Sequence, residues 1–126
     1  MAKGDFLGEF EYIVMLSLMR LGDDAYGMTI RQDIEDRAER PVTVGAVYAA
    51  LDRLEAKGYI KSREGDVTRG RGGRSKTYYS VNADGLQAVR QTRSVFRRME
   101  KGAEPKLGPA FQMEPKLGPT FQLKVA

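Results

Sequence analysis

Four cations fall within eight consecutive positions of this chain, residues 69–76, and three glycines lie between them. The cations are Arg69, Arg71, Arg74 and Lys76, and the glycines are Gly70, Gly72 and Gly73. Guanidinium and ammonium groups donate hydrogen bonds to phosphate oxygens, and glycine lets a backbone approach a phosphate closely. We therefore predict that this segment contacts a nucleic-acid backbone, with Arg71 and Arg74 as the leading phosphate or minor-groove contacts.

Two other interpretations of this basic segment stay open. It can be a solvated, flexible loop whose charges only keep the protein in solution. The Gly/Arg run also suggests a nucleotide-phosphate loop, although the Gly-Lys-Ser/Thr sequence and the helix start of a P-loop are missing.

The charge of the whole chain is uneven along its length. Residues 1–58 carry 7 Lys/Arg against 11 Asp/Glu, whereas residues 59–101 carry 11 against 4. The remaining residues, 102–126, carry 3 against 2. Clustering of one sign of charge favours contact with a polyanion through one face, since that is how proteins bind phosphate backbones.

The elements around the basic segment predict how it is presented. Residues 59–63 and 77–81 are rich in β-branched and aromatic side chains, as strands are. Before them, Thr43 is a helix-start residue, and the helix that it starts ends at Lys57-Gly58. Its apolar stripe follows helical spacing through Val44, Val47, Leu51 and Leu54. Helix, strand, basic loop and strand form the layout of a winged helix-turn-helix, a mainly α fold with a small β-hairpin.

Small residues dominate the start of this third helix, where a recognition helix meets base edges. The candidate DNA contacts here are Thr43, Gly45, Ala46, Tyr48 and Ala49, with Arg53 one turn further along. These side chains allow close approach but offer few bidentate hydrogen bonds, so we expect affinity to depend on the hairpin and sequence discrimination to be modest. Tyr48 either contacts a phosphate or packs on Tyr78 or Tyr79.

Two helices precede this unit. Residues 6–21 predict a first helix with one stripe through Phe6, Phe10, Ile13, Ser17 and Leu21, and with Val14, Leu16 and Leu18 beside it. From residue 12 to 19 this helix is apolar almost all the way round. A second helix follows Gly22-Asp23-Asp24 and ends at Pro41. Its expected inward positions are Met28, Ile30, Ile34 and Ala38. A small domain cannot cover both sides of the first helix, so a second copy of the chain is expected to do so.

The last helix, residues 83–101, starts at the cap residue Asn82 and carries an apolar band. With no later element to cover that band, we predict a homodimer, although the helix could instead fold back on its own domain. The expected dimer interface is Phe6, Phe10, Leu86, Val89, Val95, Phe96 and Met99. A cavity between Phe6, Phe10, Tyr12, Phe96 and Met99 across the two-fold axis would accept a small apolar effector.

Several function classes are excluded or disfavoured. The chain has no Cys and no His, which removes disulfides, thiolate chemistry and His-based catalysis or zinc binding. The carboxylates Asp33, Glu35, Asp36 and Glu39 could form a metal or acid/base group but fit a solvated helix face better. We expect no enzyme, no catalytic residue, no metal and no cofactor. No apolar run is long enough to span a membrane, so we expect a soluble cytoplasmic protein.

The C-terminal segment stands apart from the predicted domain at residues 1–101. Residues 104–113 are repeated almost unchanged at 114–123, and the two copies contain four prolines. Proline prevents a regular helix, and two short units are too few for a solenoid. We expect residues 102–126 to be a flexible tail, unnecessary for folding and DNA binding.

Six motifs together resemble the PadR family of bacterial transcription regulators. They are Glu11–Val14 with Leu16 and Leu18, Ala25–Gly27, Val44–Tyr48, Leu51–Glu55, Gly58–Ile60 and Arg71–Tyr79. The resemblance covers Phe6 to Met99 and implies a homodimer, joined through its first and last helices, that represses promoters and releases DNA when a small molecule binds. The short last helix looks like that of the family's compact subgroup. It has no Trp, which in some members lines an aromatic ligand cavity, and the repeated tail lies outside the family pattern.

Two function classes therefore remain. The leading hypothesis is a sequence-specific regulator that binds double-stranded DNA. The second is a protein-interaction module that reuses the winged-helix shape, with the repeated tail as its partner-binding arm.

Overall fold

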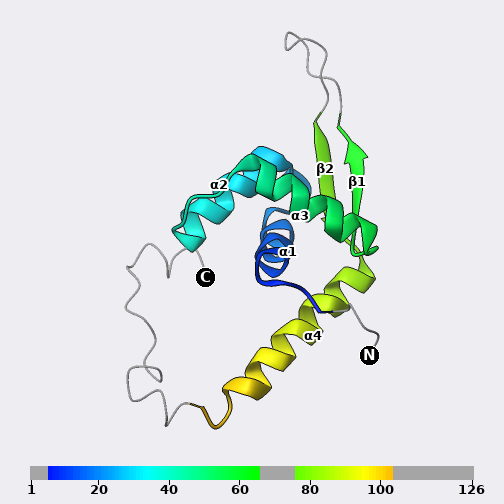
Figure 1. The fold of residues 1–126 in the computed structure, drawn as a ribbon. Helices are drawn as coiled ribbons and strands as arrows, with labels where there is room; N and C mark the ends of the chain where they lie inside the picture. Colours follow the sequence, from blue (N-terminus) through cyan, green and yellow to red (C-terminus); the bar gives the residue numbers. More distant parts are fainter. Residues whose placement is uncertain (1–5, 66–75, 104–126) are drawn as a thin grey trace. The chain divides into compact units, whose positions relative to one another are not determined.

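The computed structural model describes residues 6–65 and 76–103. The chain divides into two units, Met1–Arg93 and Ser94–Ala126, and each is described by itself. The first unit contains α1 (Glu9–Leu21), a 3-10 turn (Gly22–Asp24), α2 (Gly27–Ala38), α3 (Val44–Ala56), β1 (Ile60–Glu64) and β2 (Thr77–Val81). The last helix, α4 (Ala83–Glu100), begins in the first unit and ends in the second (Figure 1).

The first helix begins three residues later than the sequence predicts, and a different face of it is buried. Gly8 is the N-cap, and the buried residues are Glu11, Val14, Met15, Ser17 and Leu18. Of the predicted stripe, only Ser17 is buried: Phe6 is exposed, and Phe10, Ile13 and Leu21 are half-buried. Because α1 is apolar nearly all round, its periodicity does not select one face, and packing against α2 and α3 decides it.

The second helix confirms two of its four expected inward positions. Ile30 and Ile34 are buried, whereas Met28 and Ala38 are exposed. The helix ends at Ala38, before Pro41, because Glu39 takes a left-handed conformation with φ 53°. The link that follows leads to Thr43 and the start of α3, so α2 and α3 form a helix-turn-helix.

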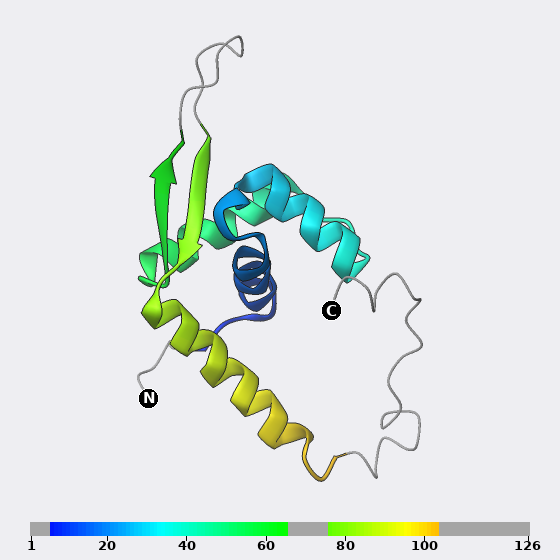
Figure 2. The same cartoon turned by 180° about the vertical axis from the view of Figure 1, so that it is seen from behind.

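The third helix and the hairpin follow the sequence closely. Thr43 Oγ1 accepts a hydrogen bond from Ala46 N–H at 3.1 Å, which confirms the predicted cap. Beyond α3, Gly58 has φ 80°, a conformation suited to glycine, and the chain turns there into β1. The two strands pair antiparallel from Ile60↔Val81 to Glu64↔Thr77 and stand side by side in both views (Figure 2).

Backbone contacts also tie the hairpin to the helices. Tyr26, just before α2, forms an isolated antiparallel bridge with Tyr78 of β2. Tyr79 N–H also donates to the carbonyl of Ala25 at 2.9 Å. The base of the hairpin is therefore fixed to the start of the helix-turn-helix.

The fourth helix is capped as predicted, since Gly85 N–H donates to Asn82 Oδ1 at 2.8 Å. Gly85 packs against the backbone of the residue before β1: a Cβ placed there would lie 2.1 Å from the carbonyl oxygen of Tyr59. Ala88, Val89 and Thr92 are also buried. Val89, expected at a dimer interface, thus belongs to the core of its own chain.

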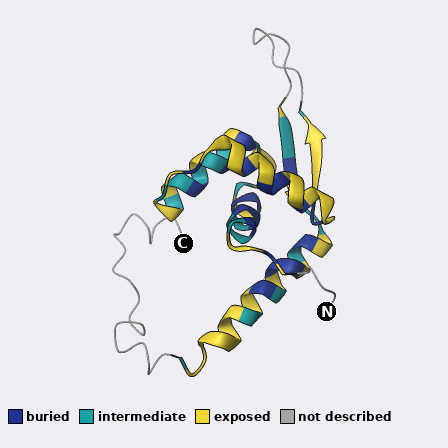
Figure 3. Ribbon diagram, viewed as in Figure 1, coloured by how far each residue is buried: buried dark blue, intermediate teal, exposed yellow. Residues whose placement is uncertain are grey.

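The core lies among α1, α2, α3, β1, β2 and the first half of α4 (Figure 3). Its fully buried larger side chains are Val14, Met15, Ile30, Ile34, Val47, Leu51 and Leu54. Within residues 6–65 and 76–103, no helix has the length and apolar character needed to cross a membrane.

In the second unit, the described residues are the end of α4 and the turn after it. Arg98 Nη1 donates to Ser94 Oγ at 2.9 Å, one helical turn away. Val95 is half-buried, while Phe96 and Met99 are exposed. The predicted tail from residue 104 onward lies outside the described residues.

Candidate nucleic-acid interface

The N-terminal half of α3 presents the predicted DNA contacts on its exposed face. Val47, Ala50, Leu51 and Leu54 point into the core. The five predicted contacts at the start of the helix, Thr43, Gly45, Ala46, Tyr48 and Ala49, are all exposed. One predicted apolar anchor, Val44, is not buried: it is 39% exposed. The structure therefore brings these residues together at one accessible helix end.

Tyr48 is held against the beginning of α2. A Cβ built on Gly27 would lie 2.3 Å from the Tyr48 hydroxyl oxygen and 2.6 Å from its ring carbon Cζ. Only glycine fits at this contact unless Tyr48 moves. Burial raises the pKa of Tyr79, and the nearby Tyr48 adds to that rise, followed by Glu55 and Asp52. The contact that the structure gives Tyr48 is thus with Gly27, a partner that neither sequence interpretation named.

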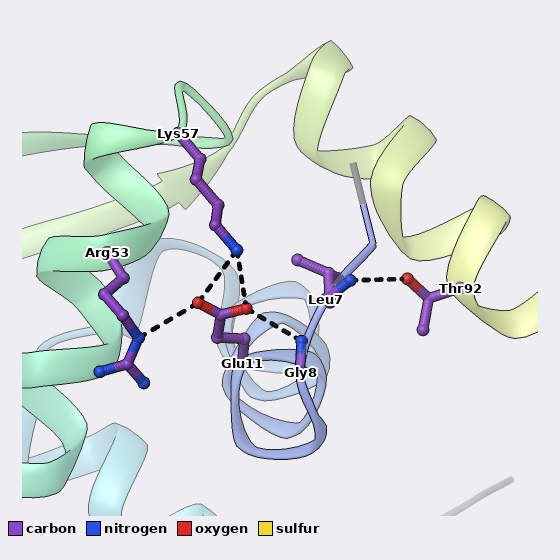
Figure 4. Close-up of polar contacts among 6 residues, drawn as sticks. All are labelled: Leu7, Gly8, Glu11, Arg53, Lys57 and Thr92. Carbon is purple, nitrogen blue, oxygen red and sulfur yellow. Dashed lines mark hydrogen bonds and ion pairs between the residues drawn. The ribbon is translucent and has the colours of Figure 1, made fainter. Parts of the chain in front are cut away.

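Arg53, in the C-terminal half of α3, is bound to a carboxylate that the sequence interpretation overlooked. Its Nε donates to Glu11 Oε2 at 3.2 Å, and its two terminal nitrogens lie away from that carboxylate (Figure 4). Lys57 Nζ donates to both oxygens of Glu11, at 3.0 and 3.2 Å, and Gly8 N–H donates to Oε1 at 2.9 Å. We call these four residues the Glu11 cluster.

The carboxylate of the Glu11 cluster is both buried and ionised. Only 5% of Glu11 is exposed. Burial alone would raise the pKa of Glu11, but hydrogen bonds from Gly8, Lys57 and Arg53 and the charge of Lys57 outweigh it and lower that pKa. Next to the cluster, Leu7 N–H donates to Thr92 Oγ1 at 3.2 Å, which ties α4 to the segment entering α1 (Figure 4).

The base of the hairpin carries a second set of contacts, made of rings and cations. Tyr26 and Tyr78 meet edge to face with centroids 5.4 Å apart. Lys76 Nζ lies 4.4 Å from the Tyr26 ring centroid and donates to its hydroxyl at 3.3 Å. Arg63 lies 4.7 Å from the centroid of Tyr78. We call these four residues the aromatic cluster; it holds two cations at the foot of the basic loop.

Not every predicted contact can be placed. Lys76 lies just before β2, whereas Arg69, Arg71 and Arg74 fall outside the described residues. Arg63 was missed because a single cation in a predicted strand carries no signal, and Gly27 was missed as the partner of Tyr48. Glu11 could have been found as an acidic residue on an otherwise apolar helix, since such a residue needs a partner when buried.

Two hollows in the first unit are open to solvent. One, of about 470 Å³, lies between the end of α1, the end of β2 and the start of α4; its lining includes Met19, Val81 and Leu86. The other, of about 540 Å³, lies beside the start of α3 and is lined by Phe10, Arg40, Pro41, Val42, Thr43 and Ala46. Phe10, expected at a dimer interface, thus borders a hollow next to the start of α3.

Two acidic residues of α2, Asp33 and Glu35, form ion pairs. Asp33 accepts from buried Ser17 at 2.7 Å and pairs with Arg20 and Arg37. Glu35 pairs with Arg31 at 3.0 Å and accepts from Val42 N–H. In the part of the chain that the structure describes, no group of three or more acidic side chains is placed to hold a metal ion.

Comparisons with known proteins identify the relatives of this arrangement. Residues 15–91 match the model of the transcriptional regulator PadR-like family. A PadR family regulator from hypervirulent Clostridium difficile is 26% identical with a TM-score of 0.63, and the match covers 79% of this chain and 99% of that one. A transcriptional regulator from Clostridium thermocellum is 28% identical with a TM-score of 0.61, covering 72% and 85%.

A PadR family regulator from Eggerthella lenta shares the fold, with 24% identity, a TM-score of 0.62 and coverage of 80% and 88%. No curated protein matches the chain.

Proposed function

The chain belongs to the PadR-like family of transcriptional regulators, and we propose that it is a homodimeric repressor with α3 in the major groove and the hairpin loop on the DNA backbone. Regulators of this family bind DNA and are not enzymes, so no catalytic residue or cofactor is assigned. Since its target is the chromosome, it acts in the cytoplasm.

One observation carries this proposal: the capped, exposed start of α3 is followed by a hairpin whose base holds two cations. Thr43 fixes the helix start, and the bridge between Tyr26 and Tyr78 fixes the hairpin to α2. The cations Arg63 and Lys76 lie where the basic loop leaves the strands. This arrangement supports phosphate contacts from the hairpin and base contacts from α3.

The experiment is a comparison of specific and random duplexes over a range of salt concentrations. Selection of bound genomic fragments by the purified protein supplies the specific duplex. Arg71→Ala and Arg74→Ala should weaken binding to both duplexes and lower the salt slope by about one per lost phosphate contact. Lys106→Ala, a matched loss of charge in the tail, should change neither.

The division of labour between the hairpin and α3 is tested with the same duplexes. Substitutions at Thr43, Ala46 or Ala49 should change which sequence is preferred while leaving the salt slope intact. A protein that binds all duplexes weakly, with a shallow salt dependence, would contradict the proposal and favour the protein-interaction module.

The proposed dimer uses the first helix and the exposed end of α4. Phe96 and Met99 are exposed in the second unit, and Phe6 in the first, which leaves apolar surface for a second copy to cover. The double substitution Val95→Glu, Phe96→Glu should give a protein that sediments as a monomer at micromolar concentration. A wild-type protein that sediments as a monomer there would overturn this part of the proposal.

An effector completes the proposal. A small apolar molecule that binds between the two copies would change the separation of the recognition helices, and it would act only through its differential affinity for the two arrangements. Compounds that bind the dimer should therefore lower its affinity for the selected duplex. Binders that all leave DNA affinity unchanged would remove the effector from the proposal.

A further inference from the structure

The side chains that α3 offers to a groove are almost all apolar. Its exposed face over the first two turns consists of Val44, Gly45, Ala46, Tyr48 and Ala49. None of these five carries a carboxamide, guanidinium or ammonium group, which are the side chains that recognise purines by paired hydrogen bonds. The N-terminal half of this helix therefore cannot read bases in the commonest way.

The polar groups around this face are engaged or limited in what they can read. Thr43 Oγ1 accepts from Ala46 N–H as the helix cap. Tyr48 rests on Gly27. Arg53, which Glu11 binds through Nε, lies in the C-terminal half of the helix, beyond this face. Asp52 is exposed at the next turn, but an ionised carboxylate only accepts hydrogen bonds.

Val44 is an apolar residue on this face whose exposure the fold of the free protein does not explain. It is the first residue of α3 and is 39% exposed. A β-branched side chain lowers helix propensity, and exposed apolar surface gains nothing in the free protein. Beside it, Gly45 has open space around the position of a Cβ, so the backbone can come close to a partner.

In the major groove, the 5-methyl group of thymine is the apolar feature that a side chain can recognise. We propose that α3 identifies its operator through thymine methyl groups, contacted by Val44 and Ala49, with Gly45 allowing the close approach. This inference rests on the proposed function and names the chemical group that the recognition helix reads. The operator half-site accordingly contains thymines at the positions facing the start of α3.

The test uses the selected duplex with deoxyuridine substituted for thymidine, one position at a time. This change removes a methyl group and leaves the pairing and the phosphates intact. At the positions facing α3, affinity should fall about fourfold per methyl, the factor for burying one such group. Replacing the same T·A pair by C·G should weaken binding, and 5-methylcytosine at that position should restore part of it.

Protein variants connect the effect to named residues. Val44→Ala and Val44→Thr both remove apolar contact from an exposed position, so the fold should be kept, as circular dichroism can verify. In these variants the deoxyuridine substitution that weakens the wild type should have little further effect at one position. Met28→Ala, which shortens an exposed apolar side chain of α2, is the matched control and should preserve the full effect.

Three results would overturn the inference, and they are distinguishable. A protein that selects one sequence but tolerates deoxyuridine at every position reads that sequence by other means, and the proposed function then stands alone. A protein with no sequence preference overturns both. A deoxyuridine effect that persists unchanged in Val44→Ala and in Ala49→Gly would also contradict the assignment to these residues.

Discussion

The C-terminal half of α3 and the base of the hairpin are fixed by different kinds of interaction. In the Glu11 cluster, one buried carboxylate accepts from two cations and a backbone N–H. In the aromatic cluster, two rings meet edge to face and two cations lie over them at the surface. A buried charge that loses its partners strongly destabilises a fold, whereas removing one aromatic ring removes only the modest energy of its own contacts. Loss of one partner should therefore lower the free energy of unfolding more in the Glu11 cluster than in the aromatic cluster.

The largest effect is expected from Glu11→Ala. Arg53, Lys57 and the N–H of Gly8 lose a shared partner, and unfolding free energy should fall by about 2–3 kcal/mol, because the cations stay partly solvated. Chemical denaturation measures this change. Glu9→Ala removes a solvated carboxylate two residues away, one that pairs with Arg40, and should cost no more than about 0.5 kcal/mol. Equal losses for the two variants would mean that the Glu11 cluster adds nothing.

A smaller loss is expected at the aromatic cluster. Tyr78→Ala removes the ring that meets Tyr26 and carries Arg63, and stability should fall by about 1–2 kcal/mol. Tyr78→Phe keeps the ring and should retain most of that stability. A loss in Tyr78→Phe as large as in Tyr78→Ala would assign the effect to the hydroxyl and contradict the ring-based account.

The two clusters also differ in their response to acid. The pKa of Glu11 is lowered in the folded protein, so its stabilisation is complete above the ordinary carboxyl range, near pH 4.3, and is lost as pH falls through the lowered value. The stability difference between wild type and Glu11→Gln should therefore shrink on acidification from pH 6 to pH 3. The stability difference between wild type and Tyr78→Ala should stay nearly constant across that range. Thermal melts at several pH values measure both differences, and a clear change with pH in the Tyr78→Ala difference would contradict this contrast.

The smallest effect on stability is expected from Gly27→Ala. The new methyl group meets the outer end of the exposed Tyr48 side chain, which can swing away, and alanine favours a helix by about 1 kcal/mol. The net change in stability should stay below about 1 kcal/mol. Displacing Tyr48 should nevertheless alter DNA affinity at constant salt slope. Gly45→Ala adds a methyl group in open space and serves as the control for helix propensity.

Local signals were enough for part of this fold. Thr43 and Asn82 were predicted as caps from residue type alone, and both accept the expected backbone N–H. The hairpin was predicted within one residue, because two runs rich in β-branched and aromatic residues flank a segment that cannot be buried. These features depend on neighbours a few residues away, so the sequence contains the information they need. The family resemblance likewise came from short motifs, and it is confirmed.

Other features needed the tertiary structure. The sequence by itself determined the helices, the hairpin, the basic loop and the family, because these follow from local hydrogen bonding and residue spacing. Only packing decided that Met15 of α1 faces the core while Phe6, just before the helix, is exposed. Packing also decided that Val89 belongs to the core and that Glu11 meets Arg53 and Lys57. Arg53 and Lys57 lie 42 and 46 residues after Glu11 along the chain, so local sequence does not pair them. An apolar helix, in turn, has several faces that could be buried. The face that is buried is the one whose few polar groups find partners, and that is a property of the assembled fold.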